Sequence, residues 1–169
     1  MNLKPTTIAY FNLLKKAACI ALVLPFASSA ETFSVIEPKP ISEVWLNPGM
    51  VTYHLKNNSE LNGTNYGLGG EYRYSTVSSV TLGVFNNSFR DTSHYVGWYW
   101  QPLGVGPIRV GAAVGAINGY PQHRDGSWFF SLVPTASFEY NNIGASLMYM
   151  PPHIKTSGAI SFQLRFKVY

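Results

Sequence analysis

The sequence predicts an all-β fold: an eight-stranded antiparallel transmembrane β-barrel over residues 48–169, preceded by a short N-terminal segment. Three observations predict it. Apolar and polar residues alternate with a period of two through most of the chain, as they do in strands that have two different faces. Only 12% of the residues are charged and 15% are aromatic, whereas about a quarter of an average soluble domain is charged. After residue 30, no apolar run reaches the roughly 18 residues that a spanning helix needs.

Residues 1–30 have the order of a secretory signal peptide. Three lysines precede the apolar run "AACIALVLPF", and "ASSA" then supplies the small residues of a cleavage site. The only cysteine, Cys19, lies in the apolar run. Cleavage is therefore expected to leave a mature chain without a thiol or a disulfide, exported from the cytoplasm.

Residues 31–47 are expected to form a short periplasmic segment before the barrel. Their sequence, "ETFSVIEPKPISEVWLN", contains Pro38 and Pro40, which leave room for only a turn or two of helix after Pro40.

The charge of the chain argues against a nucleic-acid partner. The formal net charge is +4, but three of the 12 basic residues belong to the signal peptide, so nine remain against eight acidic residues. The mature chain is close to neutral and has no basic stripe, which is the feature expected of a nucleic-acid binder. We expect a monomer with no nucleic acid bound.

Eight segments carry the alternation. They cover residues 51–55, 66–74, 80–84, 95–101, 108–114, 130–139, 143–149 and 160–168. In the last of them, five apolar residues from Ile160 to Val168 fall on one face, and Ser161, Gln163, Arg165 and Lys167 fall on the other. This is the period of a strand that separates two environments.

The character of the two faces favours a membrane barrel over a secreted β-sandwich. A sandwich turns its polar face to water, where charges are abundant, whereas here the polar face is rich in Gly, Ser and Thr. Small polar residues fit the narrow interior of a small barrel, and an apolar face with aromatic residues near the strand ends fits lipid. With the signal peptide, these faces predict the outer membrane of a Gram-negative bacterium.

Two prolines lie where a strand would need backbone donors. Pro134 is inside the segment "SLVPTASFEY", and Pro151 ends the segment "NIGASLMYM". Proline has no N–H for a strand ladder, so these positions are either deliberate breaks in the pairing or strand ends.

The lengths of the connections give the barrel a direction. Longer loops at 56–64, 89–93, 118–127 and 152–157 alternate with shorter turns at 75–79, 102–107 and 141–142, and in outer-membrane barrels the longer loops face outward. All four histidines (His54, His94, His123 and His153) and Ser88 then fall at the outer rim. A histidine base and a serine hydroxyl are the minimum for acyl-transfer chemistry.

Short segments in order resemble the PagP-type lipid A palmitoyltransferases of the outer membrane. "VTYH" resembles the segment with that family's catalytic histidine and points to His54. "GVFNNSF" resembles its Asp-Ser segment and points to Ser88, with Asn87 in the place of the aspartate. "WQPL", "LVPTAS", "LMYMPP" and "LRFKV" resemble the later strands, and the resemblance runs from about Pro48 to Tyr169.

The resemblance implies transfer of a long acyl chain, palmitoyl, from a phospholipid to a hydroxyl of lipid A, without a cofactor or a metal. His54 would be the general base, Ser88 its hydrogen-bonding partner or the nucleophile, and Asn87 a donor to the oxyanion. Pro134 and Pro151 would open a lateral gate between the sixth and seventh strands. The acyl chain would occupy an interior with small residues at Gly67, Gly69, Gly83, Gly97, Gly111 and Gly115.

Other interpretations remain open at this point. The chain departs from the family at Asn87 and at Asn65, which replaces a proline before the second strand, and a non-catalytic structural or adhesive barrel fits the same strands. A lipid A deacylase could use Ser93 and His94. The rim histidines with Asp91 and Asp125 could hold a metal, although their spacing matches no ligand motif.

Overall fold

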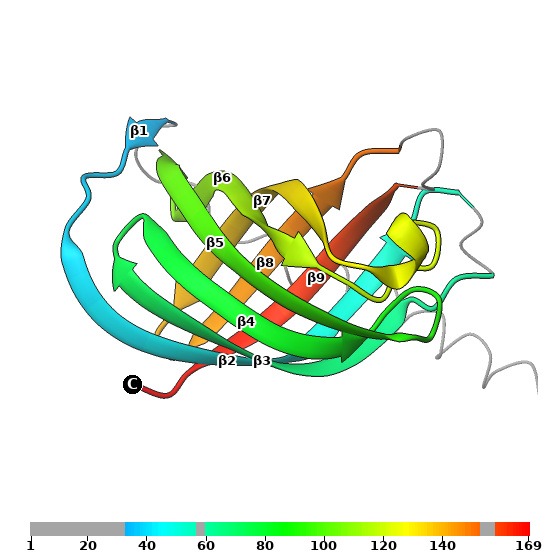
Figure 1. Cartoon of the computed structure of the whole chain (residues 1–169). Coiled ribbons are helices and arrows are strands. Elements are labelled where there is room, and N and C mark those ends of the chain that lie inside the picture. The colour runs from blue at the N-terminus through cyan, green and yellow to red at the C-terminus, as the bar shows by residue number, and fades with distance from the viewer. Residues whose placement is uncertain (1–32, 57–59, 153–157) are drawn as a thin grey trace, which may run out of the picture. The chain divides into compact units, whose positions relative to one another are not determined.

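Eight strands of the chain form one antiparallel sheet that closes on itself (Figure 1). The structure is a computed structural model that describes residues 33–56, 60–152 and 158–169. The chain divides into two units, residues 1–31 and 32–169, and the described residues all belong to the second. The predicted signal peptide and His153 lie outside the described residues.

The barrel strands follow one another along the chain. They are β2 (Pro40–His54), β3 (Thr64–Ser75), β4 (Ser78–Asn86), β5 (Thr92–Val105), β6 (Ile108–Ile117), β7 (Phe129–Tyr140), β8 (Ile143–Met150) and β9 (Ala159–Lys167). Each pairs antiparallel with its neighbour, and pairing of β2 with β9 joins the last strand to the first. A closed sheet leaves no unpaired edge, and the predicted eight-stranded barrel is confirmed. Within the described residues, no helix is long and apolar enough to cross a membrane.

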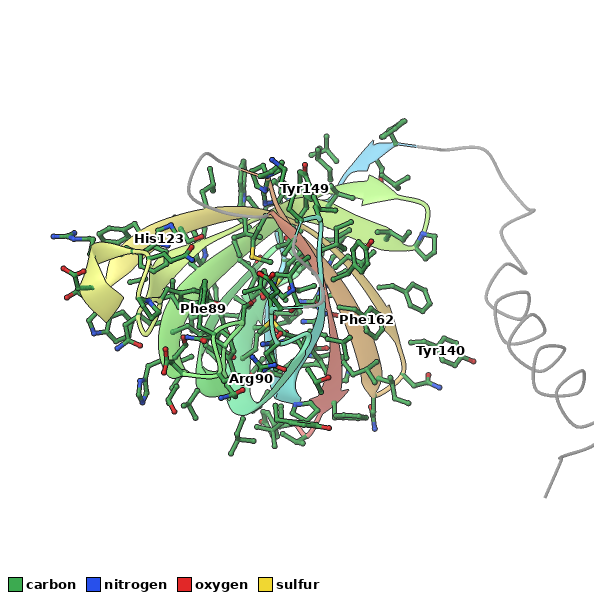
Figure 2. The ribbon with its side chains drawn as sticks, turned by 90° about the vertical axis from the view of Figure 1, so that its right-hand side faces the viewer. Phe89, Arg90, His123, Tyr140, Tyr149 and Phe162 are labelled. Carbon is green, nitrogen blue, oxygen red and sulfur yellow. The ribbon has the colours of Figure 1, made fainter. Side chains whose placement is uncertain are left out.

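The two faces of the sheet have the predicted character. Thr81 faces the interior and is 7% exposed, whereas its neighbour Leu82 faces outward and is 64% exposed. Tyr140 and Phe162 likewise project away from the ribbon (Figure 2). Around the barrel, most buried side chains are polar and many large apolar side chains are exposed, which is the reverse of the pattern in a soluble protein. The fold is therefore consistent with an outer-membrane protein.

The connections separate the two ends of the barrel. Residues 55–63, 87–91, 118–128 and 151–158 join strands at one end, which we call the loop end. The two-residue connections 76–77, 106–107 and 141–142 join them at the other, the turn end. A short 3₁₀ turn, η1 (Arg124–Gly126), lies within the third of the long connections.

The barrel begins earlier than the sequence predicts. The assignment of residues 31–47 to a preceding segment is wrong for residues 40–47, because β2 starts at Pro40 and pairs with β3 from there. Residues 40–47 are therefore extended rather than helical. A further two-residue strand, β1 (Ser34–Val35), pairs with β5 and was not predicted.

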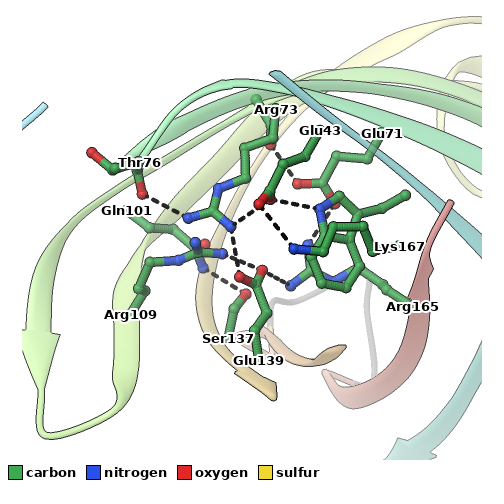
Figure 3. A network of polar contacts seen from close by, with 12 residues as sticks. Glu43, Glu71, Arg73, Thr76, Gln101, Arg109, Ser137, Glu139, Arg165 and Lys167 are labelled. Atoms are coloured by element: carbon green, nitrogen blue, oxygen red, sulfur yellow. Dashed lines mark hydrogen bonds and ion pairs between the residues drawn. The ribbon is translucent and has the colours of Figure 1, made fainter. Parts of the chain in front are cut away.

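An ion network fills the barrel interior at the turn end (Figure 3). Its charged members come from five strands and are Glu43, Glu71, Arg73, Arg109, Glu139, Arg165 and Lys167. Glu139 lies at its centre: Oε2 accepts from Arg73 Nη1 at 2.6 Å, and Oε1 accepts from Arg109 Nη2 at 2.6 Å. Oε1 also accepts from Arg165 Nη2 at 2.9 Å.

Replacing Glu139 by glutamine is expected to destabilise the barrel. The change would remove the carboxylate that Arg73, Arg109 and Arg165 share, and Glu139 is the only acid partner of Arg109 within the described residues. Removing one partner of a buried ion pair costs about 3–5 kcal/mol. We expect a matching fall in the free energy of unfolding by urea in detergent micelles, and an earlier loss of the gel-mobility shift on heating. The control is Glu37→Gln, which breaks the exposed pair between Glu37 and Lys39 and should change stability by less than about 1 kcal/mol. Equal stabilities of the two variants would contradict a structural role for the network.

Candidate functional site

His54 and Ser88 meet at the loop end of the barrel. The Nε2 atom of His54 lies 2.8 Å from the Oγ atom of Ser88. His54 is the last residue of β2 and is 4% exposed, and Ser88 lies in the connection between β4 and β5. With the imidazole protonated on Nδ1, Nε2 accepts the hydrogen bond of the serine hydroxyl, which is the geometry of a nucleophile and its base.

A bulge in β2 turns His54 into the barrel. Trp45 and Asn47 face inward at odd positions, whereas Thr52 and His54 face inward at even positions. The pairing with β9 has four residues of β2 opposite three of β9 between Leu46 and Val51, so β2 carries one extra residue there. Without it, His54 would point outward, because successive side chains of a strand alternate between its faces.

Gly49 is the residue that permits this bulge. Its φ is +104°, and a Cβ at this position would lie 2.7 Å from the Gly67 nitrogen and 2.9 Å from the Tyr66 carbonyl carbon. Any other residue at position 49 would require the backbone to shift, because of both the positive φ and the contact with β3.

Three asparagines near the loop end hold Ser88 in place. Asn62 donates its backbone N–H to the Ser88 carbonyl oxygen at 2.8 Å, and its side-chain Nδ2 donates to Oδ1 of Asn86 at 2.8 Å. Asn65 in β3 donates to the Asn86 carbonyl oxygen, also at 2.8 Å. These contacts tie the connection after β2 to the connection after β4. Sequence reasoning missed them, although the asparagines in "LNGTN" and "FNNS" were a signal.

Asn87 has a structural role that differs from the predicted one. Its side chain is fully buried, and Nδ2 donates to the Gly119 carbonyl oxygen at 2.6 Å and to Ser93 Oγ at 2.9 Å. Oδ1 accepts the backbone N–H groups of Phe89 at 2.8 Å and Asp91 at 3.1 Å. Since both amide hydrogens are engaged, the prediction that Asn87 donates to an oxyanion is wrong.

His54 and Ser88 both line an interior cavity of about 370 Å³. Most of its wall is apolar and includes Phe85, Phe89 and Met148. Volumes of this order are typical of sites for small organic ligands. The cavity occupies the part of the barrel that the ion network leaves open.

Two of the six glycines assigned to the cavity wall line it. Gly97 of β5 and Gly115 of β6 do so, opposite each other in the ladder. The other four, Gly67, Gly69, Gly83 and Gly111, are not part of the lining.

Those four glycines give space to neighbouring protein atoms instead. A Cβ at Gly83 would lie 2.7 Å from the Tyr95 hydroxyl, and one at Gly69 would meet the same hydroxyl and the Asn47 amide. Gly67 and Gly111 make similarly close approaches to adjacent strands. Their assignment to an acyl-chain cavity is therefore corrected: Tyr95 lies against Gly69 and Gly83, and atoms of the adjacent strand lie against Gly67 and Gly111.

Four aromatic side chains gather at the mouth of the cavity. Tyr120 meets Phe89 and Phe129 edge to face, with ring centroids 6.1 and 6.0 Å apart, and His123 stacks on Phe129 at 4.7 Å. Burial raises the pKa of the Tyr120 phenol to about 12, although a side-chain hydrogen bond with Ser88 partly opposes the shift. The phenol next to Ser88 is therefore protonated at neutral pH.

Ser93 and His94 do not form a second catalytic pair. Ser93 and His94 are successive residues of β5, so their side chains leave opposite faces; Ser93 is fully buried and His94 is exposed. Among the residues that the structure describes, no group of three or more His, Cys, Asp or Glu side chains is arranged to hold a metal ion.

The two prolines border an interruption in the sheet. The ladder between β6 and β7 runs from Phe129 to Phe138, but the ladder between β7 and β8 ends at the pair Thr135 and Met148. Pro134 occupies the next position of β7, and Pro151 follows the last residue of β8. Residues on both sides of the interruption, including Val133, Met150 and Pro151, line the cavity.

Comparison of this chain with protein-family models and with curated protein sequences finds no match.

Replacing Asn87 by aspartate is expected to destabilise the loop end. The amide nitrogen, which donates to both Gly119 and Ser93, would become a carboxylate oxygen that faces the Gly119 carbonyl oxygen without a hydrogen between them, and a buried unpaired polar group costs about 1–3 kcal/mol, more when charged. The free energy of unfolding by urea should fall by at least that amount. The control is Asn142→Asp in an exposed two-residue turn, which should unfold like the parent. A stable Asn87→Asp variant would show that this position accepts the carboxylate that the family resemblance places there.

Proposed function

We propose that the protein is an outer-membrane acyltransferase that moves a long acyl chain, palmitoyl, from a phospholipid to a hydroxyl group of lipid A. The observation that carries the proposal is the 2.8 Å contact between His54 Nε2 and Ser88 Oγ at the mouth of an apolar cavity. The sequence resemblance had selected the same two residues, from segments 34 positions apart.

The contact supports a two-step reaction. In the first step, Ser88 Oγ attacks the ester carbonyl of the phospholipid while His54 accepts the serine proton. The ester C–O bond breaks, His54 returns the proton to the departing oxygen, and the products are an acyl-serine and a lysophospholipid. In the second step, a hydroxyl of lipid A attacks the acyl-serine, and His54 takes the hydroxyl proton and returns it to Ser88.

The oxyanion of each step needs donors other than Asn87. The hydroxyl of Tyr120 is one candidate, because it lies beside Ser88 and is protonated at neutral pH.

Three features support a membrane location and a lipid substrate. The outward face carries large apolar side chains that water would solvate poorly, such as Phe130 at 87% exposure. The cavity wall is apolar and its volume suits an acyl chain. The interruption between β7 and β8 borders the cavity, so it offers a lateral path from the bilayer with Pro134 and Pro151 at its margins.

A non-catalytic structural barrel is the second candidate. Asn87 favours it, because the residue in the position of the family's aspartate holds a loop together instead of contacting His54. Mass spectrometry of lipid A separates the two functions.

Lipid A from a Gram-negative host that expresses the protein is expected to gain the mass of one palmitoyl group. His54→Ala and Ser88→Ala should each abolish the gain, and the double change should cost little more than either alone, because the two residues act as one unit. His94→Ala is the control, since this rim histidine is exposed on the outward face of β5 and is not part of the cavity lining, and it should leave the profile unchanged. Heat-dependent gel mobility should be the same for all variants. Identical lipid A with and without the parent protein would favour the structural barrel.

Pro134→Ala is expected to close the interruption between β7 and β8. It restores one backbone donor, so the barrel should gain about 0.5–1.5 kcal/mol, the net value of a hydrogen bond, while acyl transfer falls. The matched control is Pro107→Ala in an exposed turn, which should leave acyl transfer unchanged. Combining Pro134→Ala with Pro151→Ala should reduce transfer further with His54 and Ser88 intact. Full activity in the double variant would show that lipid does not pass here.

A further inference from the structure

A groove on the outer wall of the barrel adjoins the cavity and shares Val96, Ala116 and Phe129 with its lining. It has a volume of about 350 Å³ and is lined by Val96, Ala116, Arg124, Trp128, Phe129 and Phe130. Val96, Ala116 and Phe130 are cross-strand partners on β5, β6 and β7, so their side chains share one face. That face is the outward one, because Val96 and Phe130 are 52% and 87% exposed.

The connection between β6 and β7 supplies a cation to this apolar groove. Arg124 is exposed, and within the described part of the chain its guanidinium group forms no ion pair or hydrogen bond. Next to Arg124, this connection contributes Trp128 to the groove, and the start of β7 contributes Phe129. Both residues are aromatic. The groove is therefore apolar along the strands and positively charged at the loop end.

Backbone contacts hold Arg124 in this position. The Ser127 N–H donates to the Arg124 carbonyl oxygen at 3.0 Å, and Gly126 N–H donates to the His123 carbonyl oxygen at 3.1 Å. Gly119 N–H donates to the Gly126 carbonyl oxygen at 2.9 Å, which ties the start of the connection to its middle. The ring of His123, next to Arg124, stacks on Phe129 (the loop is seen beside His123 in Figure 2).

We propose that this groove binds one phospholipid, with the phosphate of the headgroup at Arg124 and one acyl chain along Val96, Ala116 and Phe130. The charge and the apolar row match the two parts of such a molecule, and Trp128 lies where a tryptophan ring at a membrane interface meets the headgroup region. The inference rests on the membrane location in the proposed function.

The position of the groove gives the bound lipid a role. Phe130 lies in the part of β7 that pairs with β6 on one side. On its other side, toward β8, the same part of β7 is unpaired and forms the interruption next to Pro134. A phospholipid in the groove would be one strand away from the path to His54 and Ser88. We infer that it is the acyl donor, held before it moves into the cavity.

Tryptophan fluorescence offers a direct test. Trp98→Phe and Trp100→Phe remove the other outward tryptophans, and Trp45 is buried inside the barrel, so quenching by brominated lipid reports on Trp128. The purified barrel in zwitterionic detergent micelles would be titrated with phosphatidylglycerol that has brominated acyl chains. Brominated diacylglycerol, which has no phosphate, is the control lipid.

Arg124→Gln should raise the phosphatidylglycerol fraction needed for half-quenching about fivefold, which is the effect of one interfacial basic residue. Arg124→Lys keeps the charge and should bring the half-quenching fraction most of the way back to that of the parent. Arg90→Gln is the matched control, an exposed loop-end arginine outside the groove, and should bind like the parent. Ala116→Phe, which fills the groove and leaves Arg124 in place, should also reduce quenching. His54→Ala should not change it, so binding can be present when acyl transfer is absent.

Three results would overturn the proposal. One is equal quenching in the parent and Arg124→Gln barrels, both shown to be folded by their heat-dependent gel mobility. Another is equal quenching of the parent by brominated phosphatidylglycerol and brominated diacylglycerol. The third is displacement of the brominated lipid by lipid A at a lower fraction than by unlabelled phosphatidylglycerol, which would assign the groove to the acceptor.

Discussion

Closure of an eight-stranded sheet is the constraint on which the rest of this structure depends. It joins the last strand to the first, so that every barrel strand has a neighbour on both sides, although the ladder between β7 and β8 is interrupted, and it leaves an interior just wide enough for side chains. Each strand then contributes alternate residues to that interior. The size of those inward side chains decides whether the interior at a given height along the barrel axis is filled or leaves a cavity.

The two ends of this barrel use the interior in opposite ways. At the turn end, charged side chains from β2, β3, β6, β7 and β9 join in one network around Glu139. At the loop end, Gly97, Gly115 and apolar side chains leave a cavity. Because the interior changes from filled to hollow along its length, the buried His54 and the half-buried Ser88 can face open space while the ion network fills the other end of the barrel.

Much of this arrangement could be predicted from the sequence because alternation is a local signal. The strands near the C-terminus are regular, and Ile160 and Ser161 already show which face is apolar. Proximity of His54 and Ser88 also follows from strand order, since both come at the loop ends of strands in the same sheet. The start of β2 could not be predicted in this way, because Pro40, Pro48 and the bulge at Gly49 interrupt its alternation.

Residue roles that depend on distant partners were beyond the sequence. Asn87 has the place of a catalytic-site residue in the resemblance, but its amide bonds to Gly119, 32 residues later. The glycines of β3 and β4 suggest empty space until Tyr95 is seen to cross over Gly69 and Gly83. In both cases the group that decides the role, the Gly119 carbonyl or the Tyr95 side chain, comes from another strand or connection, and no local sequence pattern predicts it.

The position of the ion network also explains how the sheet tolerates an interrupted ladder. Glu139 lies on β7 at the turn end, four residues beyond Thr135, where pairing with β8 begins. Its bonds to Arg73, Arg109 and Arg165 tie β7 to β3, β6 and β9 across the interior. A strand held this way on the inside does not depend on its ladder to β8 along its whole length. The cross-barrel ion pairs are thus concentrated on the turn-end side of the interruption, and the missing β7–β8 pairs fall beside the cavity.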